Sequence, residues 1–243
     1  MRLITRVHGL IPGTIYPEVI TFVKLSVIIP VFNEVETIQE IVERVRKVPL
    51  EKEILLVDDS STDGSGEILA KLSSDPDTLV LSHPVNRGKG VAIATALEVV
   101  TGDVVVIQDA DLEYNPQDYL TLIEPILQED AAVVYGVRNL SSQRAIMRLG
   151  NNLLSWIASL LFKVKLYDME TCYKMMTRAV FQTLSLECRR FDVEAEITAK
   201  ILRAGFVINE CPITYNARYD NKKLSPLDGI PTLRALLKYR FFA

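Results

Sequence analysis

Short runs of apolar, β-branched residues recur along the first half of the chain, and each run ends at a polar turn that carries an acid. The runs cover residues 25–29, 53–57 and 104–107. Continuous apolar runs of this length are typical of strands that are buried on both faces of a parallel sheet. A helical stretch follows each turn, as in an α/β fold. We therefore predict a single Rossmann-like α/β domain with a mostly parallel central sheet flanked by helices.

A longer apolar stretch, residues 149–162, has the period of a helix. Its large side chains fall on one face: Leu149, Leu153, Trp156, Ile157, Leu160 and Leu161. Neither this stretch nor any other reaches the roughly 18 apolar residues that a spanning helix needs. Arg148 and Lys163 flank it. Two interpretations stay open: a helix that lies on a membrane surface, or a helix that packs on the core.

Composition narrows the possible functions. The 243 residues are 49% hydrophobic, which is enough for one substantial core. A net charge of −4 argues against a protein that binds nucleic acid through bulk electrostatics. The three cysteines lack metal-type spacing, so we expect ordinary reduced thiols. Neither His8 nor His83 has a plausible ligand partner nearby in the sequence, so we expect no zinc site.

The most informative polar turn is the pair Asp109 and Asp111 at the end of the 104–107 strand. Open α/β sheets bind ligands at the carboxyl ends of their strands. Two carboxylates at this edge repel each other unless a positive charge sits between them. Mg²⁺ commonly takes one or two carboxylates and completes its shell with water and substrate phosphates. The pair therefore indicates a site for a metal and a diphosphate, and the alternative is a solvated turn.

Four motifs in order resemble family 2 inverting glycosyltransferases. They are SVIIPVFNE at 26–34, VDDSSTDGS at 57–65, NRGKG at 86–90 and the acidic pair at 109–111. Within that family the chain is most similar to the polyprenyl-phosphate (dolichyl-phosphate) mannosyl- and glucosyltransferases. DMETCYK at 168–174, RFDVEAE at 190–196 and PITY at 212–215 support this branch more loosely. The resemblance implies a GT-A fold and a nucleotide-sugar donor.

The resemblance also organises the chain into three parts. We expect an irregular leader at 1–24, which does not read as a signal peptide, and a catalytic domain at 25–217. A basic, amphipathic segment follows at 218–243. Residues 131–167 likewise contain cations but no Asp or Glu. Anionic lipids attract such segments with about 1 kcal/mol per nearby cation. A membrane anchor is absent by nature, supplied by a partner protein, or missing from this sequence.

On the donor side, we expect Asp111 to hold Mg²⁺ or Mn²⁺, with Asp109 in support, so that the cation neutralises the leaving diphosphate. Asp58 suits N–H and O–H donors of the base or ribose, because a carboxylate only accepts hydrogen bonds. Lys89, at a predicted helix start, suits phosphate. By resemblance, Pro30, Asn33 and Glu34 form the wall near the base. We expect Asp59 and Asp63 to cap the following helix.

On the acceptor side, two chemistries stay open. A hydroxyl acceptor needs a general base, and Asp192 and Glu194 are the candidates. A lipid phosphate is already ionised and needs cations instead, for which the candidates are Arg138, Arg144 and Arg148. Related enzymes often place a Ser-Arg pair where this chain has Met147 and Arg148.

We therefore predict a metal-dependent, inverting hexosyltransferase that uses GDP-mannose or UDP-glucose and polyprenyl (dolichyl or undecaprenyl) phosphate. We expect it to be cytoplasmic and bound peripherally to the cytoplasmic face of the membrane. One alternative is a family 2 enzyme that acts on a saccharide hydroxyl in polysaccharide synthesis. Another is a non-catalytic module that binds nucleotide sugars or membrane surfaces. The donor base and sugar stay open.

Overall fold

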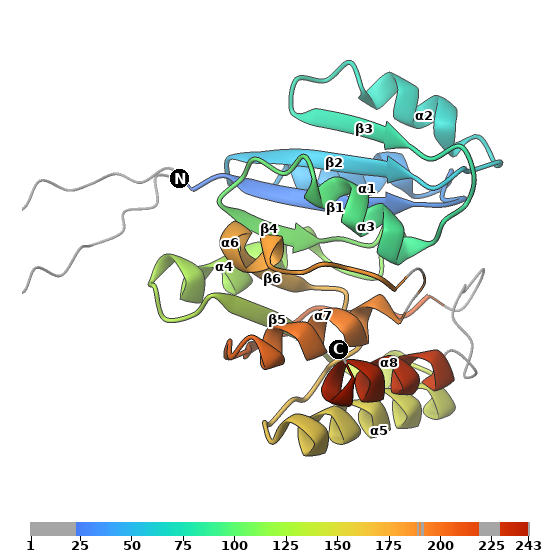
Figure 1. Ribbon diagram of the computed structural model, residues 1–243. Coiled ribbons are helices and arrows are strands. Elements are labelled where there is room, and N and C mark those ends of the chain that lie inside the picture. Colours follow the sequence, from blue (N-terminus) through green and yellow to red (C-terminus); the bar gives the residue numbers. More distant parts are fainter. Residues whose placement is uncertain (1–22, 189, 191, 219–228, 243) are drawn as a thin grey trace, which may run out of the picture.

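The computed structural model describes residues 23–188, 190, 192–218 and 229–242, so residues 1–22 of the predicted leader lie outside it. Strands and helices alternate along the chain (Figure 1). The strands are β1 (Leu25–Val31), β2 (Lys52–Asp58), β3 (Thr78–Ser82), β4 (Val104–Ile107), β5 (Val133–Arg138), β6 (Lys174–Thr177) and β7 (Asn209–Ile213). The helices are α1 (Ile38–Arg46), α2 (Ser65–Leu72), α3 (Lys89–Leu97), α4 (Tyr119–Leu127), α5 (Ala145–Phe162), α6 (Arg178–Gln182), α7 (Val193–Arg203) and α8 (Gly229–Phe241).

The seven strands form one sheet in the order β3-β2-β1-β4-β6-β5-β7. All neighbouring strands are parallel except β6, which runs antiparallel to both β4 and β5. Ile28 in β1 pairs with Leu55 on one side and with Ile107 on the other. The predicted α/β fold with a mostly parallel sheet is therefore confirmed. The sequence did not predict that a strand near residue 175 enters the sheet between β4 and β5.

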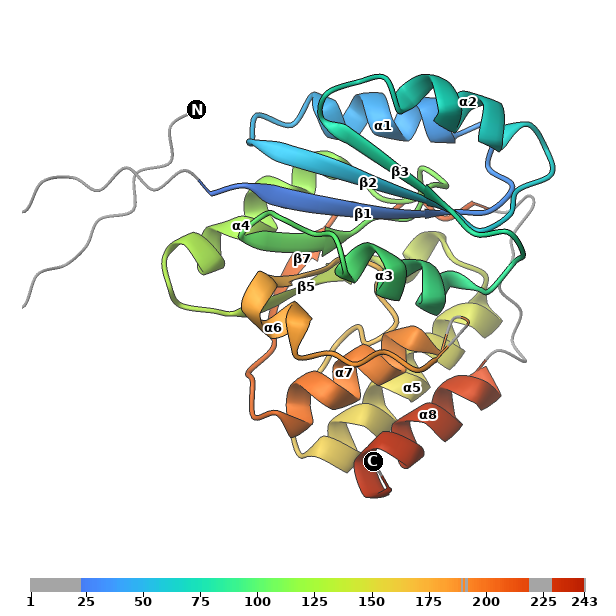
Figure 2. The ribbon, with the colours of Figure 1, turned by 45° about the horizontal axis from the view of Figure 1, so that its top comes forward.

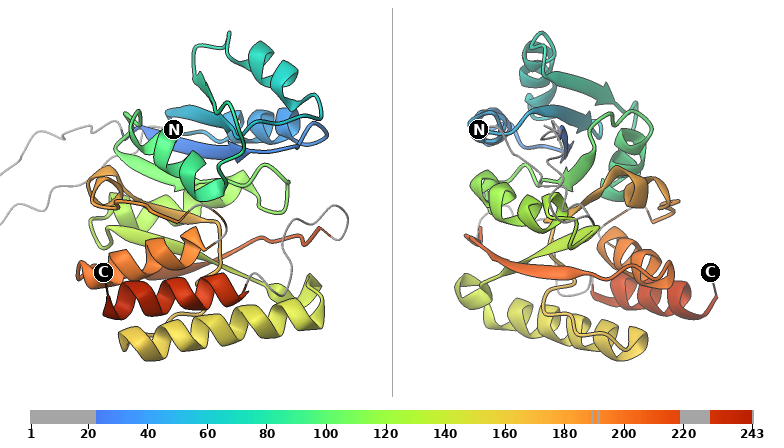
Figure 3. Two further views of the ribbon diagram at one scale, coloured as in Figure 1. Left: turned by 45° about the vertical axis from the view of Figure 1, so that its right-hand side comes forward. Right: turned by 90° about the vertical axis from the view of Figure 1, so that its left-hand side faces the viewer.

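Helices cover both faces of the sheet. Helices α1, α2 and α4 lie on one face, and α3, α6 and α7 lie on the other (Figures 2 and 3). Helix α8 packs on α7 and α5 packs on α8, which builds a helical layer beyond β5. The turns that follow β1, β2, β4 and β5 meet at one edge of the sheet, as parallel strands require.

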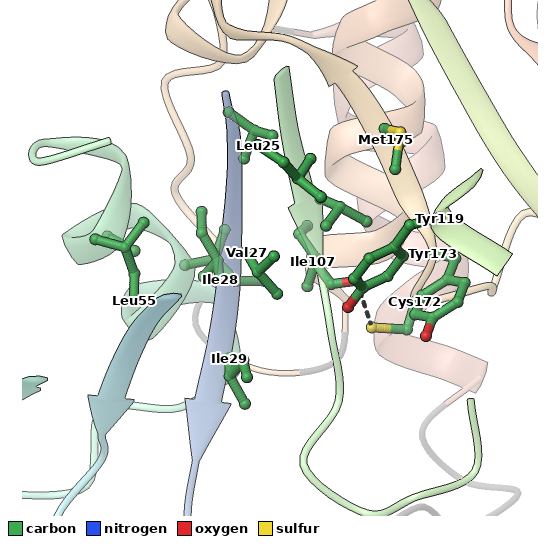
Figure 4. Close-up of a cluster of buried hydrophobic side chains, with 14 of the residues drawn as sticks. Leu25, Val27, Ile28, Ile29, Leu55, Ile107, Tyr119, Cys172, Tyr173 and Met175 are labelled. Atoms are coloured by element: carbon green, nitrogen blue, oxygen red, sulfur yellow. Dashed lines mark hydrogen bonds between the residues drawn. The ribbon is translucent and has the colours of Figure 1, made fainter. Parts of the chain in front are cut away.

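The main core is formed by the strands that the apolar runs predicted. Val27, Ile28 and Ile29 in β1 are fully buried, and so is Ile107 in β4. Tyr119 and Tyr173 pack against the end of β4 (Figure 4). The side chain of Cys172 lies in the same cluster, and its thiol donates to the backbone carbonyl of Ile107 at 3.5 Å. The segment before β6 is thereby held against β4.

A second, smaller core joins α5, α7 and α8. Leu154 and Ala158 in α5, Ala195 and Ala199 in α7, and Leu236 in α8 are buried there. This packing uses the narrow side of α5, because Ser155 is its only other buried residue. The opposite side carries large side chains that remain exposed: Ile146, Leu149, Leu153, Trp156 and Leu160.

The structure corrects our expectation for α5 in one respect. The helix begins at Ala145, four residues before the predicted stretch, and is 18 residues long. Among the described residues it is the one helix with the length and apolar composition of a membrane-crossing segment. Of the six side chains on the predicted face, Ile157 and Leu161 are partly buried against the second core. We call the five exposed side chains, Ile146, Leu149, Leu153, Trp156 and Leu160, the α5 stripe.

Candidate active site

A cavity of about 360 Å³ opens at the carboxyl edge of the sheet. Segments far apart in the sequence line it: the ends of β1, β4 and β5, the first turns of α3, α5 and α7, and the segment before β6. Predicted site residues from five of these segments meet here: Pro30, Glu34, Lys89, Asp109, Asp111, Arg138 and Glu194. The other predicted site residues, Asn33, Asp58, Arg144, Arg148 and Asp192, do not line the cavity.

A chain of alternating charges runs through the cavity wall. The Lys89 Nζ lies 2.7 Å from Asp109 Oδ1 and 2.9 Å from Glu194 Oε1. The other oxygen of Glu194 is 2.5 Å from Nζ of Lys174, which is fully buried. Burial alone would lower the pKa of Lys89, but the charges of Asp109 and Glu194 hold it well above its usual value. Glu194 therefore lies between the side-chain nitrogens of two lysines, Lys89 and Lys174.

The pKa values of Asp109 and Asp111 are shifted in opposite directions. Burial raises the pKa of Asp109, but the charge of Lys89 outweighs burial and lowers it. For Asp111, burial and the neighbouring charges of Asp109 and Glu113 raise the pKa to about 7. Its Oδ1 accepts a hydrogen bond from the backbone N–H of Glu113 at 3.2 Å. The turn that allows this contact places Leu112 at a φ of 63°, a region that non-glycine residues seldom adopt.

These two carboxylates fit a hard divalent cation. Burial and the neighbouring charges of Asp109 and Glu113 raise the pKa of Asp111, and a bound cation would offset both effects. No cluster of three or more His, Cys, Asp or Glu side chains able to hold a metal occurs in the described ranges. A site with only two carboxylates suits Mg²⁺ or Mn²⁺, since such ions take further ligands from water and substrate phosphates. Asp109 and Asp111 are thus the residues that would hold the metal.

The turn after β1 is tied to the turn after β2. Asn33, at a φ of 52°, accepts at Oδ1 from the Thr62 N–H at 2.8 Å. Asp58 Oδ1 accepts from the Ser61 N–H at 3.0 Å. Both side chains therefore shape the rim beside the cavity. Glu34 is buried in the cavity wall and binds Arg218 through both oxygens, at 3.1 and 3.2 Å.

We had expected Asp59 to cap the helix that follows it, and this prediction is wrong. Its carboxylate accepts from the backbone N–H groups of Arg87 and Gly88, at 2.8 and 2.6 Å, and contacts His83 Nδ1 at 2.7 Å. It therefore holds the loop that precedes α3. Gly88 has a φ of 92° there, where a side chain would be strained. Asp63 does lie at the start of α2, where its Oδ1 accepts from the Ser65 N–H at 2.9 Å.

The predicted phosphate-binding arginines fall in two places. Arg138 lines the cavity, and Asp168 fixes it through two bonds, from Nε at 2.7 Å and from Nη2 at 2.8 Å. Its guanidinium also lies over the Tyr215 ring at 5.2 Å. Arg144 and Arg148 are exposed at the first turn of α5, outside the cavity.

Asp192 and Glu194 occupy different environments. Glu194 is buried in the cavity wall, whereas Asp192 is the N-cap residue of α7 and accepts from the Arg190 N–H at 3.2 Å. Glu196, one turn along α7, accepts from two backbone N–H groups and binds Lys200 at 2.7 Å. Of these three acids, only Glu194 lines the cavity.

Sequence reasoning missed several residues that line the cavity. They are Glu113, Glu170, Arg190, Tyr215 and Arg218. Glu113 accepts from the Tyr215 hydroxyl at 2.7 Å and from the Arg218 N–H at 2.7 Å, which closes the cavity from the carboxyl-terminal part of the chain. A usable signal existed for Glu170, because it is an acid in the otherwise mostly uncharged stretch 169–173 before β6.

Comparisons with known proteins show the family to which the chain belongs. The family model "Glycosyl transferase family 2" matches residues 26–184. An undecaprenyl-phosphate 4-deoxy-4-formamido-L-arabinose transferase of Pectobacterium atrosepticum is 40% identical over 106 residues, which cover 41% of this chain and 32% of that protein. The protein of the same description from Photorhabdus laumondii is 33% identical over 131 residues, or 51% and 40% of the two chains. The chain thus spans only about a third of the length of the relatives it matches first.

Solved structures share the fold across most of the chain. Glucosyl-3-phosphoglycerate synthase from Mycobacterium tuberculosis in complex with uridine diphosphate has a TM-score of 0.70 at 23% identity, covering 90% of this chain and 80% of that one. The same enzyme with Mn²⁺, UDP-glucose and phosphoglyceric acid gives a TM-score of 0.70 at 22% identity, with the same coverage. Likeness at this identity shows the fold alone.

Proposed function

The chain belongs to glycosyl transferase family 2, and we propose that it is an inverting enzyme that transfers a hexose from a nucleotide diphosphate sugar to polyprenyl phosphate. One observation carries the choice of acceptor. The cavity that contains Asp109 and Asp111 extends to Met147 and Asn151 on α5, the helix whose other side bears the exposed α5 stripe. A polar site that reaches an apolar surface suits an acceptor with a phosphate head and a hydrocarbon tail.

The donor binds, in this proposal, across the ends of β1, β2 and β4. Pro30 and Glu34 in the cavity wall, with Asn33 and Asp58 on the rim beside it, receive the base and ribose. Asp111 and Asp109 hold Mg²⁺ or Mn²⁺, which when bound would offset the charge of the departing diphosphate. Lys89 offers its ammonium at the same place. Donors of the GDP-mannose and UDP-glucose types both suit these residues, and a structural neighbour binds UDP-glucose with Mn²⁺.

The acceptor side favours an ionised nucleophile. Glu194 is held between two lysines, so it is a weak candidate for accepting a proton from a hydroxyl. Three arginines line the cavity instead: Arg138, Arg190 and Arg218. Asp168 engages one side of Arg138 and leaves Nη1 as its remaining end. A lipid phosphate needs cations of this kind to offset its charge and align it with the anomeric carbon.

The lipid tail and the membrane lie, in this proposal, along α5 and α8. Leu149, Trp156 and Leu160 are each more than 60% exposed. Arg144, Arg148, Lys163 and Lys165 are exposed near the two ends of α5, where they can meet anionic headgroups. Apolar α8 side chains, Leu237 and Phe241 among them, are exposed as well. We place the enzyme peripherally at the cytoplasmic face, and an anchoring partner protein stays a prediction.

A transfer assay in lipid vesicles tests the proposal. The protein is incubated with radiolabelled GDP-mannose or UDP-glucose, Mn²⁺ or Mg²⁺, and vesicles that contain undecaprenyl or dolichyl phosphate. We expect label in the lipid fraction. Vesicles with the corresponding polyprenol, which has a hydroxyl in place of the phosphate, are the matched control and should stay unlabelled. Transfer to a saccharide hydroxyl, with none to lipid phosphate, would contradict the proposed acceptor and leave the family assignment intact.

A further inference from the structure

Glu170 stands in the segment that leads into β6. Because β6 runs antiparallel between β4 and β5, the residues just before it lie at the same sheet edge as the residues just after β4. The thiol of Cys172 donates to the carbonyl of Ile107, the last residue of β4, which fixes this segment beside the end of β4 (Figure 4). The Lys174 side chain also holds this segment, because its Nζ donates to the carbonyl oxygens of Met169 and Thr171. The backbone around Glu170 is thus firmly placed, and its side chain lines the cavity.

The carboxyl group of Glu170 has an unmet bonding requirement. Its Oε1 is buried and receives no hydrogen bond from any residue that the structure describes. Its neighbours Asp168 and Glu194 are both satisfied by cations, Arg138 and Lys174 respectively. A buried polar atom without a partner is costly, and such atoms in native proteins call for an explanation. An arriving ligand that donates a hydrogen bond supplies one.

We propose that Glu170 determines donor specificity by accepting a hydrogen bond from a hydroxyl group of the sugar that is transferred. This inference rests on the proposed function, because it assumes a nucleotide-sugar donor at Asp109 and Asp111. The order of strands supports it. The proposed base pocket lies at β1, the diphosphate at β4, and the next position along the sheet is the segment before β6. A sugar attached to the diphosphate extends in that direction.

The chemistry of Glu170 favours a sugar over the other groups that enter the cavity. A carboxylate repels a phosphate, so Glu170 is unsuited to bind the acceptor head. A carboxylate only accepts hydrogen bonds, which matches the donor hydroxyls of a hexose. Burial raises the pKa of Glu170 to about 7, with the charge of Glu194 adding to this and that of Lys174 opposing it. Hydrogen bonds donated to the ionised form would offset that cost.

The test compares affinities for a nucleotide sugar and for the bare nucleotide diphosphate. Isothermal titration calorimetry with Mn²⁺ is run on wild-type protein and Glu170→Gln, using UDP-glucose and UDP or GDP-mannose and GDP, whichever pair the wild type binds. A hydrogen bond to a charged group is worth roughly tenfold or more in affinity. We expect the variant to bind the nucleotide sugar about tenfold more weakly. Its affinity for the nucleotide diphosphate should stay within about twofold, since that ligand lacks the hydroxyl.

Deoxy-sugar donors identify the hydroxyl. One deoxy analogue should bind the wild-type protein as weakly as the full donor binds Glu170→Gln. The affinity of that analogue should be the same for Glu170→Gln as for the wild type. Glu170→Asp keeps the charge but is one methylene shorter, so it should also bind the nucleotide sugar weakly. Glu40→Gln, a matched change on the exposed face of α1, should leave both affinities unchanged.

The outcomes separate the two claims. Equal weakening of nucleotide sugar and nucleotide diphosphate in Glu170→Gln would overturn the role of Glu170 and leave the proposed function standing. Wild-type affinity for the nucleotide sugar in Glu170→Asp would also overturn the role of Glu170. A carboxylate that is too short to reach the sugar hydroxyl would then be sufficient. Wild-type protein that binds neither nucleotide pair would overturn the proposed function and this inference together.

Discussion

Glu194 offers the sharpest test of how the cavity is built. We predict that Glu194→Gln destabilises the protein rather than removing a catalytic base. The change leaves Lys174 fully buried with two backbone carbonyls as its remaining partners. Breaking a buried ion pair by removing one partner costs roughly 3–5 kcal/mol. Gln can still accept a hydrogen bond, so we expect the lower end, about 3 kcal/mol. In a chain of this size that lowers Tm by roughly 6–12 °C.

The assay is thermal unfolding at pH 7.5, with the pH profile of kcat/KM as the second readout. Glu187→Gln is the matched control, because it removes an exposed ion pair with Lys238 and should leave Tm unchanged. The double variant Lys174→Met with Glu194→Gln should cost less than the sum of its parts, since both lose the same interaction. A refuting result is a wild-type Tm together with a loss of about 10²–10⁴ in turnover and of the acidic limb of the profile.

Three further predictions concern the metal site, the membrane face and pH. Asp111→Asn should abolish turnover at unchanged Tm, since lost electrostatic stabilisation costs several kcal/mol; wild-type activity with metal present would contradict this. Trp156→Ser with Leu160→Ser should weaken binding to anionic vesicles at least tenfold, at about 1–2 kcal/mol per side chain, as measured by co-sedimentation. Val207→Ser, also exposed but outside α5 and α8, should not. Glu170 binds a proton more tightly when folded, so wild-type stability relative to Glu170→Gln should fall by roughly 3 kcal/mol between pH 4.5 and about 7. If the free energies of unfolding of wild type and Glu170→Gln differed by the same amount across that pH range, the raised pKa of Glu170 would be contradicted.

Local sequence predicted that acids following β1 and β4 would meet at one edge of the sheet, and Glu34, Asp109 and Asp111 do line one cavity there. The apolar runs at β1, β2 and β4 and the acids that follow them are contiguous in the chain, so their meeting at one edge follows from parallel pairing. The place of Glu170 depends instead on β6, a four-residue strand whose insertion between β4 and β5 leaves no local pattern. Arg218 was counted as a surface cation, yet its partner Glu34 lies 184 residues away. Lys89 and Lys174, which both bind Glu194, are likewise distant from it in the sequence, so their positions in the sequence could not predict these contacts.

The same inserted strand has a consequence for the order in which the fold is completed. β5 cannot join β4 until residues 174–177 have been synthesised, because β6 lies between them in the sheet. On the ribosome, β1 to β4 can pair as they emerge, while β5 must wait for some forty further residues. Late-closing, non-local strand pairing is slow and leaves apolar surface exposed. Until β6 is in place, β5 is not joined to the sheet, so Val133 and Val134, which are buried in the completed fold, stay exposed on the nascent chain.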